Sequence, residues 1–210
     1  MITYWATTPS LMRKLFPREL VWDMPSAKPT VYLTFDDGPH PTATPFALLE
    51  LKKYDAKATF FCVGENVTRF PNIYNDILQQ GHSTANHTFN HMNGWKTDDH
   101  IYIENIEKAS IYIDSKLFRP PYGLIKRSQT KKLQQKHPDW KIIMWSVLSG
   151  DFDRELSPEK CVENVISNIR PGSIVLFHDS EKAWERMNYA LPKVLEFCKK
   201  QGWEMKTLTQ

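Results

Sequence analysis

Short apolar runs alternate with amphipathic segments along most of this chain, and this alternation limits the possible folds more than any other feature. The apolar runs are rich in β-branched and aromatic residues, as strands covered on both faces are. Helix starts are predicted at Thr44–Pro45 and Ser157–Pro158, where a capping residue precedes a proline. The alternation predicts right-handed βαβ units and an α/β fold with a parallel sheet, whose functional residues collect at the carboxyl ends of the strands. The predicted strands cover residues 31–35, 58–63, 141–145 and 173–177.

The composition of the 210 residues is that of a globular protein, with 41% hydrophobic and 24% charged residues. The length predicts one domain that needs no disulfide to fold. The net charge of +3 comes from scattered residues and does not favour a nucleic-acid partner. The three cysteines, Cys62, Cys161 and Cys198, form no closely spaced pair, so we interpret them as packing residues.

No apolar run exceeds four residues, so we expect neither a transmembrane helix nor a secretory signal, and we expect a cytoplasmic protein. Residues 1–29 differ from the rest and are predicted to be an N-terminal extension packed on a domain of residues 30–210. An alternative is peripheral contact with the inner membrane face, because apolar and basic residues alternate in this segment. Pro9 and Pro17 interrupt the segment and favour packing on the domain. The alternating residues are Leu11, Met12, Leu15 and Phe16 with Arg13, Lys14 and Arg18.

Two carboxylates, Asp36 and Asp37, directly follow the first predicted strand. Adjacent carboxylates repel each other unless a cation neutralises them. Because successive side chains diverge, one carboxylate could bind a metal while the other faces a substrate. Asp, Gly and Pro are also common turn residues, which is the structural alternative. His87 and His91 are four residues apart, a spacing that in one helical turn places both imidazoles on one face toward a metal ion. Such a pair also arises by chance.

Three further polar groups follow predicted strands. Arg119 precedes two prolines and Tyr122, and this rigid backbone could hold the Tyr122 N–H as an oriented donor. The structural alternative for Arg119 is a turn with a surface arginine. Asp151 and His178 each follow a strand, and the structural alternative for His178 is a core histidine with a satisfied hydrogen bond. All of these groups would converge at one edge of a parallel sheet, which independent turns do not predict.

Taken in order, these motifs resemble the five motifs of polysaccharide deacetylases of the NodB-homology type, carbohydrate esterase family 4. The resemblance runs from about Val31 to the C-terminus and implies a distorted (β/α) barrel, usually of seven strands. It also implies that Asp37, His87 and His91 hold one divalent metal ion, commonly zinc, with cobalt, nickel or manganese as alternatives. By the same resemblance Asp36 is the general base, Arg119 its electrostatic partner, Tyr122 N–H an oxyanion donor, His178 the general acid and Asp151 the residue that orients His178.

The fourth motif departs from the family pattern. Leu148 stands where the family usually has a first aspartate, and Phe152 stands at the aromatic position that is often Trp. Asp151 is retained. We therefore expect an active enzyme whose pocket wall and substrate preference differ from the usual pattern.

The expected function is metal-dependent hydrolysis of an N-acyl group, foremost N-acetyl, from an amino sugar in an oligosaccharide or polysaccharide. One alternative is a deacylase or deformylase of a lipid-linked or small cytoplasmic sugar precursor. Another is a catalytically silent carbohydrate-binding protein, in which Trp95, Trp145 and Phe152 would stack on sugar rings. The complete acid–base pair favours the enzyme.

Overall fold

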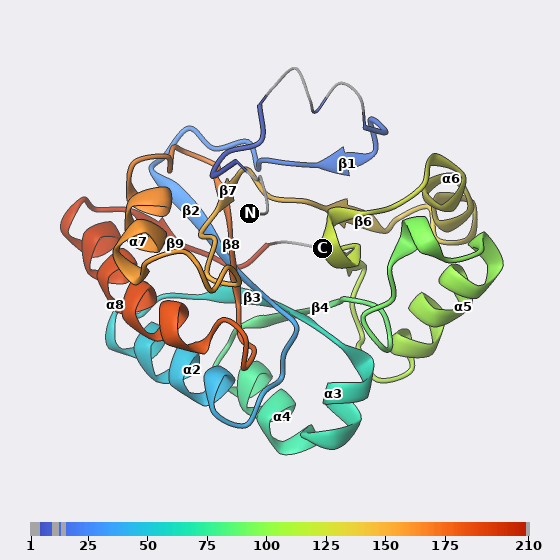
Figure 1. Ribbon diagram of the computed structural model, residues 1–210, viewed down its shortest axis with the longest axis horizontal. Helices are drawn as coiled ribbons and strands as arrows, with labels where there is room; N and C mark the ends of the chain where they lie inside the picture. The colour runs from blue at the N-terminus through green and yellow to red at the C-terminus, as the bar shows by residue number, and fades with distance from the viewer. Residues whose placement is uncertain (1–4, 10–12, 14–15, 209–210) are drawn as a thin grey trace.

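The computed structural model describes residues 5–9, 13 and 16–208. Its sheet is parallel throughout the paired strands and curls into an incomplete barrel with helices around the outside (Figure 1). The strand order is β1-β6-β5-β4-β3-β2-β8-β7, and β9 pairs with β2. The strands are β1 (Leu20–Val21), β2 (Thr30–Asp36), β3 (Ala58–Cys62), β4 (Ser83–Asn86), β5 (Leu117–Phe118), β6 (Lys141–Ile143), β7 (Val147–Leu148), β8 (Ile174–His178) and β9 (Glu204–Met205).

The predicted distorted (β/α) barrel is confirmed, but the predicted count of seven strands is wrong. In the part of the chain that the structure describes, eight strands lie along the path of the sheet, and β9 is an additional short strand. Four of the nine strands have only two residues, too few to give an alternating or apolar pattern in the sequence. Such strands are defined by their neighbours in the sheet.

The predicted helix start at Ser157–Pro158 is confirmed, but the predicted start at Thr44–Pro45 is wrong by two residues, because Thr42 precedes the helix and Thr44 and Pro45 are its second and third residues. Ser157 caps α7, where its hydroxyl accepts the N–H of Lys160 at 3.2 Å, and Pro158 is the first helical residue. Gly81, with φ of 76°, follows the end of α4. The helices are α2 (Ala43–Lys53), α3 (Gly64–Arg69), α4 (Pro71–Gln79), α5 (Asp99–Ser110), α6 (Arg127–Lys136), α7 (Pro158–Ile166) and α8 (Trp184–Lys200), with 3₁₀ turns η1 (Gly94–Lys96) and η2 (Pro121–Gly123).

The centre of the sheet is β2, which lies between β3 and β8. Phe35 stacks on Phe60 and Phe177, with ring centroids 4.9 and 6.0 Å apart, and all three side chains are fully buried. This core fixes the register of the three strands, and the same register pairs Asp36 with His178 across β2 and β8. The packing therefore places two candidate catalytic residues side by side.

Two of the described residues before residue 30 form a strand of the sheet. Leu20 and Val21 form β1 and pair with Ile142 and Ile143 of β6. The predicted boundary at residue 30 stays a prediction. Of the alternating segment, Leu11, Met12, Lys14 and Leu15 lie outside the described residues.

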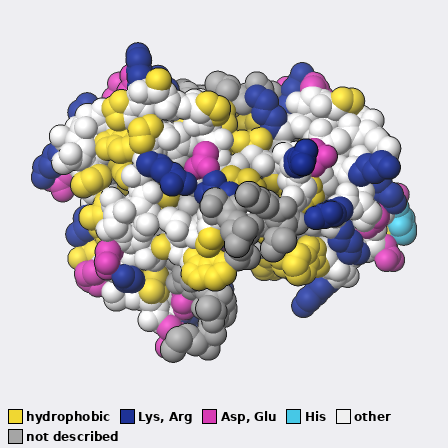
Figure 2. All heavy atoms as spheres, turned by 90° about the horizontal axis from the view of Figure 1, so that it is seen from above, with side chains coloured by type: hydrophobic (Ala, Val, Ile, Leu, Met, Phe, Trp, Pro, Cys, Tyr) yellow, Lys and Arg dark blue, Asp and Glu magenta, His cyan; other side chains and the backbone are white. Residues whose placement is uncertain are grey.

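The surface carries charged side chains of both signs, and the cysteines are buried packing residues. Seen from above, Lys and Arg side chains lie with Asp and Glu side chains among them (Figure 2). All three cysteines are free and buried, as predicted. Among residues 5–9, 13 and 16–208, no helix combines the length and the apolar composition that a membrane span requires.

Candidate active site

The predicted functional residues meet at the carboxyl edge of the sheet. Asp36 and His178 end β2 and β8, and His87 and Arg119 directly follow β4 and β5. Six of the eight predicted residues line one hollow of about 550 Å³, while Arg119 and Asp151 lie fully buried behind it. The lining residues are Asp36, Asp37, His87, His91, Tyr122, Trp145, Leu148, Phe152, Leu176, His178 and Lys182.

Three side chains in this hollow form a candidate metal site. The ligand atoms of Asp37, His87 and His91 all lie within 4.8 Å of one another. Asp37 Oδ1 is 3.7 Å from His87 Nε2 and 3.1 Å from His91 Nε2. This oxygen is buried and has no hydrogen-bond partner in the described part of the chain. Two imidazoles and one carboxylate suit a divalent first-row metal ion and leave positions open, so the residues present fit a catalytic metal.

The other nitrogen of each imidazole has a partner that orients the ring. His87 Nδ1 lies 2.8 Å from the carbonyl oxygen of Arg119, and His91 Nδ1 lies 3.2 Å from the hydroxyl of Tyr122. Because a carbonyl only accepts, His87 Nδ1 carries the proton and Nε2 presents its lone pair to the site.

The electrostatic environment favours the protonation states that a metal ion needs. Burial lowers the pKa of His87 to about 4, so this imidazole is neutral at neutral pH. Burial alone would raise the pKa of Asp37, but the close contact with His91 and the nearby His178 and His87 outweigh it and hold this pKa well below its usual value. A neutral imidazole and an ionised carboxylate are the ligand forms.

The segment from His87 to His91 is a loop, and the helical turn considered for this spacing is wrong. Thr88 and His91 adopt left-handed backbone conformations, with φ of 65° and 56°. Both backbone groups of Thr88 make hydrogen bonds that hold the loop. Its N–H donates to Asn86 Oδ1 at 2.9 Å, and its carbonyl accepts the N–H of Gly64 at 3.0 Å. Left-handed non-glycine residues are costly and persist where the surroundings hold them, commonly at functional sites.

Asp36 has a buried cationic partner. Arg119 is fully buried and its Nη1 lies 2.6 Å from Asp36 Oδ1. The other carboxylate oxygen, Oδ2, lies 3.7 Å from His87 Nε2 and so faces the candidate metal site. The same Nη1 also donates to Thr34 Oγ1 at 2.9 Å, while Nε and Nη2 donate to the carbonyls of Ile143 and Met144 at 3.2 and 2.9 Å.

His178 has a buried anionic partner on the other side of the hollow. Asp151 is fully buried and its Oδ1 lies 2.7 Å from His178 Nδ1. Burial alone would lower the pKa of His178, but the charge and hydrogen bond of Asp151 outweigh it and raise this pKa to about 9. The imidazole is therefore protonated at neutral pH and can donate a proton.

Tyr122 contributes in a way that the sequence reasoning missed. Its backbone has φ of 61°, and the hydrogen bonds that close its turn run from the Gly123 N–H to the Pro120 carbonyl and from the Leu124 N–H to the Pro121 carbonyl. Its hydroxyl contacts His91, a contact that the reasoning from the rigid backbone did not consider. The phenol was visible in the sequence, but its distance to His91 depends on the fold.

One wall of the hollow is apolar and contains both residues that depart from the family pattern. Trp145, Leu148, Phe152 and Leu176 line it, and Phe152 meets the His178 ring edge-on with centroids 5.4 Å apart. Lys182 also lines the hollow, with Nζ 5.5 Å from the Phe152 ring centroid. The sequence reasoning did not single out Lys182, Leu176 or Thr34. Trp95, considered as a sugar platform, is exposed but is not a lining residue.

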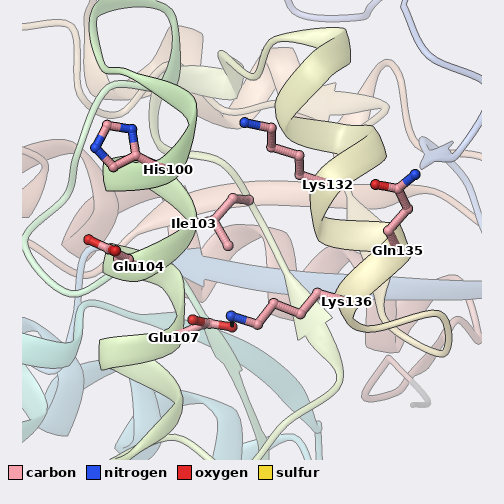
Figure 3. A pocket seen from close by; sticks show the side chains of 7 residues that line it. All are labelled: His100, Ile103, Glu104, Glu107, Lys132, Gln135 and Lys136. Carbon is pink, nitrogen blue, oxygen red and sulfur yellow. Dashed lines mark ion pairs between the residues drawn. The ribbon is translucent and has the colours of Figure 1, made fainter.

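A second hollow, of about 430 Å³, lies between α5 and α6 (Figure 3). Lys136 of α6 and Glu107 of α5 point toward each other across it and form an ion pair. Lys132 pairs with Asp99 at 3.7 Å. None of the predicted site residues lies there, and both of its lysines have ion-pair partners.

Comparison with known proteins decides the family. A family model described as polysaccharide deacetylase matches residues 23–138. A peptidoglycan-N-acetylglucosamine deacetylase of Bacillus cereus is 33% identical over 207 residues, covering 95% of this chain and 96% of the relative. The chain belongs to the polysaccharide deacetylase family. A chitooligosaccharide deacetylase of Azorhizobium caulinodans is 33% identical over 159 residues, covering 71% of this chain and 73% of that relative.

Solved structures of other polysaccharide deacetylases share the fold. A peptidoglycan N-acetylglucosamine deacetylase in complex with 4-naphthalen-1-yl-N-oxidanyl-benzamide superposes with a TM-score of 0.86 at 34% identity, covering 96% of this chain and 95% of that one. A family pseudoenzyme from Bacillus anthracis superposes with a TM-score of 0.78 at 24% identity, covering 90% of this chain and 67% of that one. The fold therefore does not by itself establish activity, and the site residues must be tested.

Proposed function

We propose that this chain removes an N-acetyl group from an amino sugar of a polysaccharide, with a divalent metal ion, zinc before cobalt, nickel or manganese, held by Asp37, His87 and His91. One observation carries the proposal: a three-residue ligand set lies in the same hollow as a carboxylate paired with arginine and an imidazole paired with aspartate. The names of the relatives support the substrate class, since they are deacetylases of peptidoglycan N-acetylglucosamine and of chitooligosaccharides.

When bound, the metal ion would act as a Lewis acid that polarises the acyl carbonyl and would lower the pKa of a water molecule toward neutrality. The protein side chains supply the proton transfers. Asp36 accepts a proton from the attacking water, and the Arg119 guanidinium, whose Nη1 lies 2.6 Å from Asp36 Oδ1, is the buried cation beside this carboxylate. The Tyr122 N–H donates to the oxygen that becomes negative at the acyl carbon.

His178 completes the reaction as the general acid. An amine is a poor leaving group until it is protonated, and the imidazolium that Asp151 maintains supplies that proton. The candidate base thus has a buried cation beside it, and the candidate acid has a buried anion beside it.

The test of the proposal is acetate release from chitooligosaccharides and from peptidoglycan by the zinc-loaded protein. We expect release from at least one of the two, and we expect Asp36→Asn and His178→Ala to lower kcat by at least about 100-fold each, the range for general acid–base catalysis. As a matched control, Asp153→Asn changes an aspartate next to the fourth motif that is not a lining residue, and it should keep the wild-type rate. Normal turnover by both active-site variants would contradict the roles.

The same assay separates the alternatives. Release of formate or acetate from an undecaprenyl-linked amino sugar, with none from the soluble glycans, would favour a lipid-linked precursor at the inner membrane face. Binding of chitooligosaccharides at full metal occupancy, without acyl release from any substrate, would identify a silent carbohydrate-binding protein. Either result would replace the proposed substrate class.

A further inference from the structure

Asp179 lies directly after the candidate acid His178, yet it is fully buried and is not among the residues that line the hollow. It makes contacts on both sides of Asp37. Its backbone N–H donates to the carbonyl of Asp36 at 3.0 Å, and its Oδ1 accepts the N–H of Gly38 at 3.1 Å. The end of β8 thus holds the chain just before and just after the carboxylate of the candidate metal site.

The second oxygen of Asp179 holds the continuation of the same loop. Thr44, at the start of α2, donates its hydroxyl to Asp179 Oδ2 at 2.5 Å. The same hydroxyl accepts the N–H of His40 at 2.7 Å. One buried carboxylate therefore fixes the loop from Gly38 to Thr44 at both of its ends.

The conformation of this loop needs such restraint. Asp37 has φ of 82°, a left-handed conformation that is unfavourable for a residue with a side chain and persists only where the surroundings determine it. Asn66 supplies one further restraint, since its Nδ2 donates to the Asp37 carbonyl at 2.7 Å.

Gly38 shows how closely the loop fits the carboxylate. A Cβ placed on Gly38 would lie 2.1 Å from Asp179 Oδ2 and 2.6 Å from its Cγ, far inside van der Waals contact. No other side chain could stand at residue 38 without moving the loop or Asp179. The backbone at Gly38 and the Asp179 carboxylate are therefore closely packed directly beside Asp37.

We propose that Asp179 is a positioning residue for metal binding, holding the Asp37 carboxylate in its ligand position through Gly38 and Thr44. This inference rests on the proposed function, because it takes Asp37 as a metal ligand. A binding constellation must be held to within about 0.5 Å, and outer partners of ligands commonly change metal affinity by about 10–100-fold when removed.

The test is zinc affinity, measured by competition with a chromophoric chelator, together with the melting temperature of the metal-free protein. Asp179→Ala should weaken zinc binding by about 10–100-fold. Asp179→Asn should bind zinc more tightly than Asp179→Ala, because the amide oxygen can still accept the Gly38 N–H. Where Asp179→Ala does not fold, Asp179→Ser replaces it, since a hydroxyl keeps the site polar but is too short to reach Gly38.

A control and a cycle separate positioning from stability. Glu50 is a buried carboxylate on α2 that pairs with Lys53, so Glu50→Ala should lower the melting temperature and leave zinc affinity unchanged. In a double-mutant cycle of Gly38 and Asp179, Gly38→Ala should weaken zinc binding by a larger factor in the wild-type protein than in Asp179→Gly, where the added methyl has room.

The outcomes distinguish this inference from the proposed function. Wild-type zinc affinity in Asp179→Ala or its Ser replacement, with or without a lower melting temperature, would overturn the positioning role, as would additive losses in the cycle. Failure of the wild-type protein itself to bind zinc would instead overturn the proposed metal site.

Discussion

Asp151 holds His178 by both its ring and its backbone: one carboxylate oxygen lies 2.7 Å from Nδ1 and the other accepts the backbone N–H of His178 at 2.8 Å. This double contact fixes the imidazole with Nδ1 toward Asp151, so Nε2 is the atom left to face a substrate. The orientation and the charge of the candidate acid therefore depend on one buried side chain.

Asp151→Asn should shift the alkaline limb of the activity profile to lower pH. Asp151 raises the pKa of His178 to about 9, and a general acid works only while it is protonated, so activity is lost as the pH rises through that pKa. Without the negative charge the pKa falls, and the loss begins at lower pH. The measurement is kcat/KM against pH for both proteins at saturating zinc. An unchanged alkaline limb would show that His178 is not the group that titrates there.

Arg119→Met should destabilise the fold strongly. It leaves the buried carboxylate of Asp36 without its cation, and breaking a buried pair in this way costs about 3–5 kcal/mol. Urea unfolding of the metal-free protein measures the loss, and Arg170→Met, at an exposed arginine, is the matched control. In an Asp36→Asn background the same substitution should cost less, since no charge is left unpaired. Equal costs in the two backgrounds would contradict the coupling.

Tyr122→Phe should weaken metal binding and leave the rate at saturating metal largely intact. The substitution removes the hydroxyl 3.2 Å from His91 Nδ1, while the backbone N–H that we assign to the oxyanion is kept. Loss of such an outer partner commonly costs about tenfold in metal affinity. Zinc affinity and kcat at saturating zinc separate the two roles. A large fall in kcat with unchanged zinc affinity would show that the phenol acts on the substrate instead.

Leu148→Ala should widen the range of acyl groups. Leu148 is buried in the apolar wall of the hollow, and its truncation makes room for one more methylene, worth about 0.8 kcal/mol or roughly fourfold in relative rate. The measurement is the ratio of kcat/KM for N-propionyl and N-acetyl forms of one glucosamine oligomer. A ratio that does not change would place the acyl group away from this wall.

The sequence predicted those parts of the fold in which local pattern and burial agree. The strands β2 and β8 were visible because strands buried on both faces are continuously apolar. The strand β4 was missed because Ser83–Asn86 is largely polar and is defined by its pairing with β3. The helix α6 was missed because Leu133 is the only apolar residue within Arg127–Lys136.

The candidate site shows the same division. The predicted parallel strands were enough to expect that Asp36, Asp37 and His178 converge, because the carboxyl ends of parallel strands share one edge. His87 was assigned to the same edge although β4, the strand before it, was not recognised. The loop geometry was not predictable: the left-handed conformations of Thr88 and His91 bring the two imidazoles together without a helix. The contacts of Tyr122 with His91 and of Asp179 with Gly38 join residues far apart in the chain, and no local pattern encodes them.

The most direct test of the central claim is acetate release by the metal-free protein as zinc is added back in steps. The account predicts no release without metal, a rise that ends at one zinc ion per chain, and no recovery in Asp37→Ala at the same zinc concentrations. Full activity of the metal-free protein, or wild-type activity of Asp37→Ala, would contradict it.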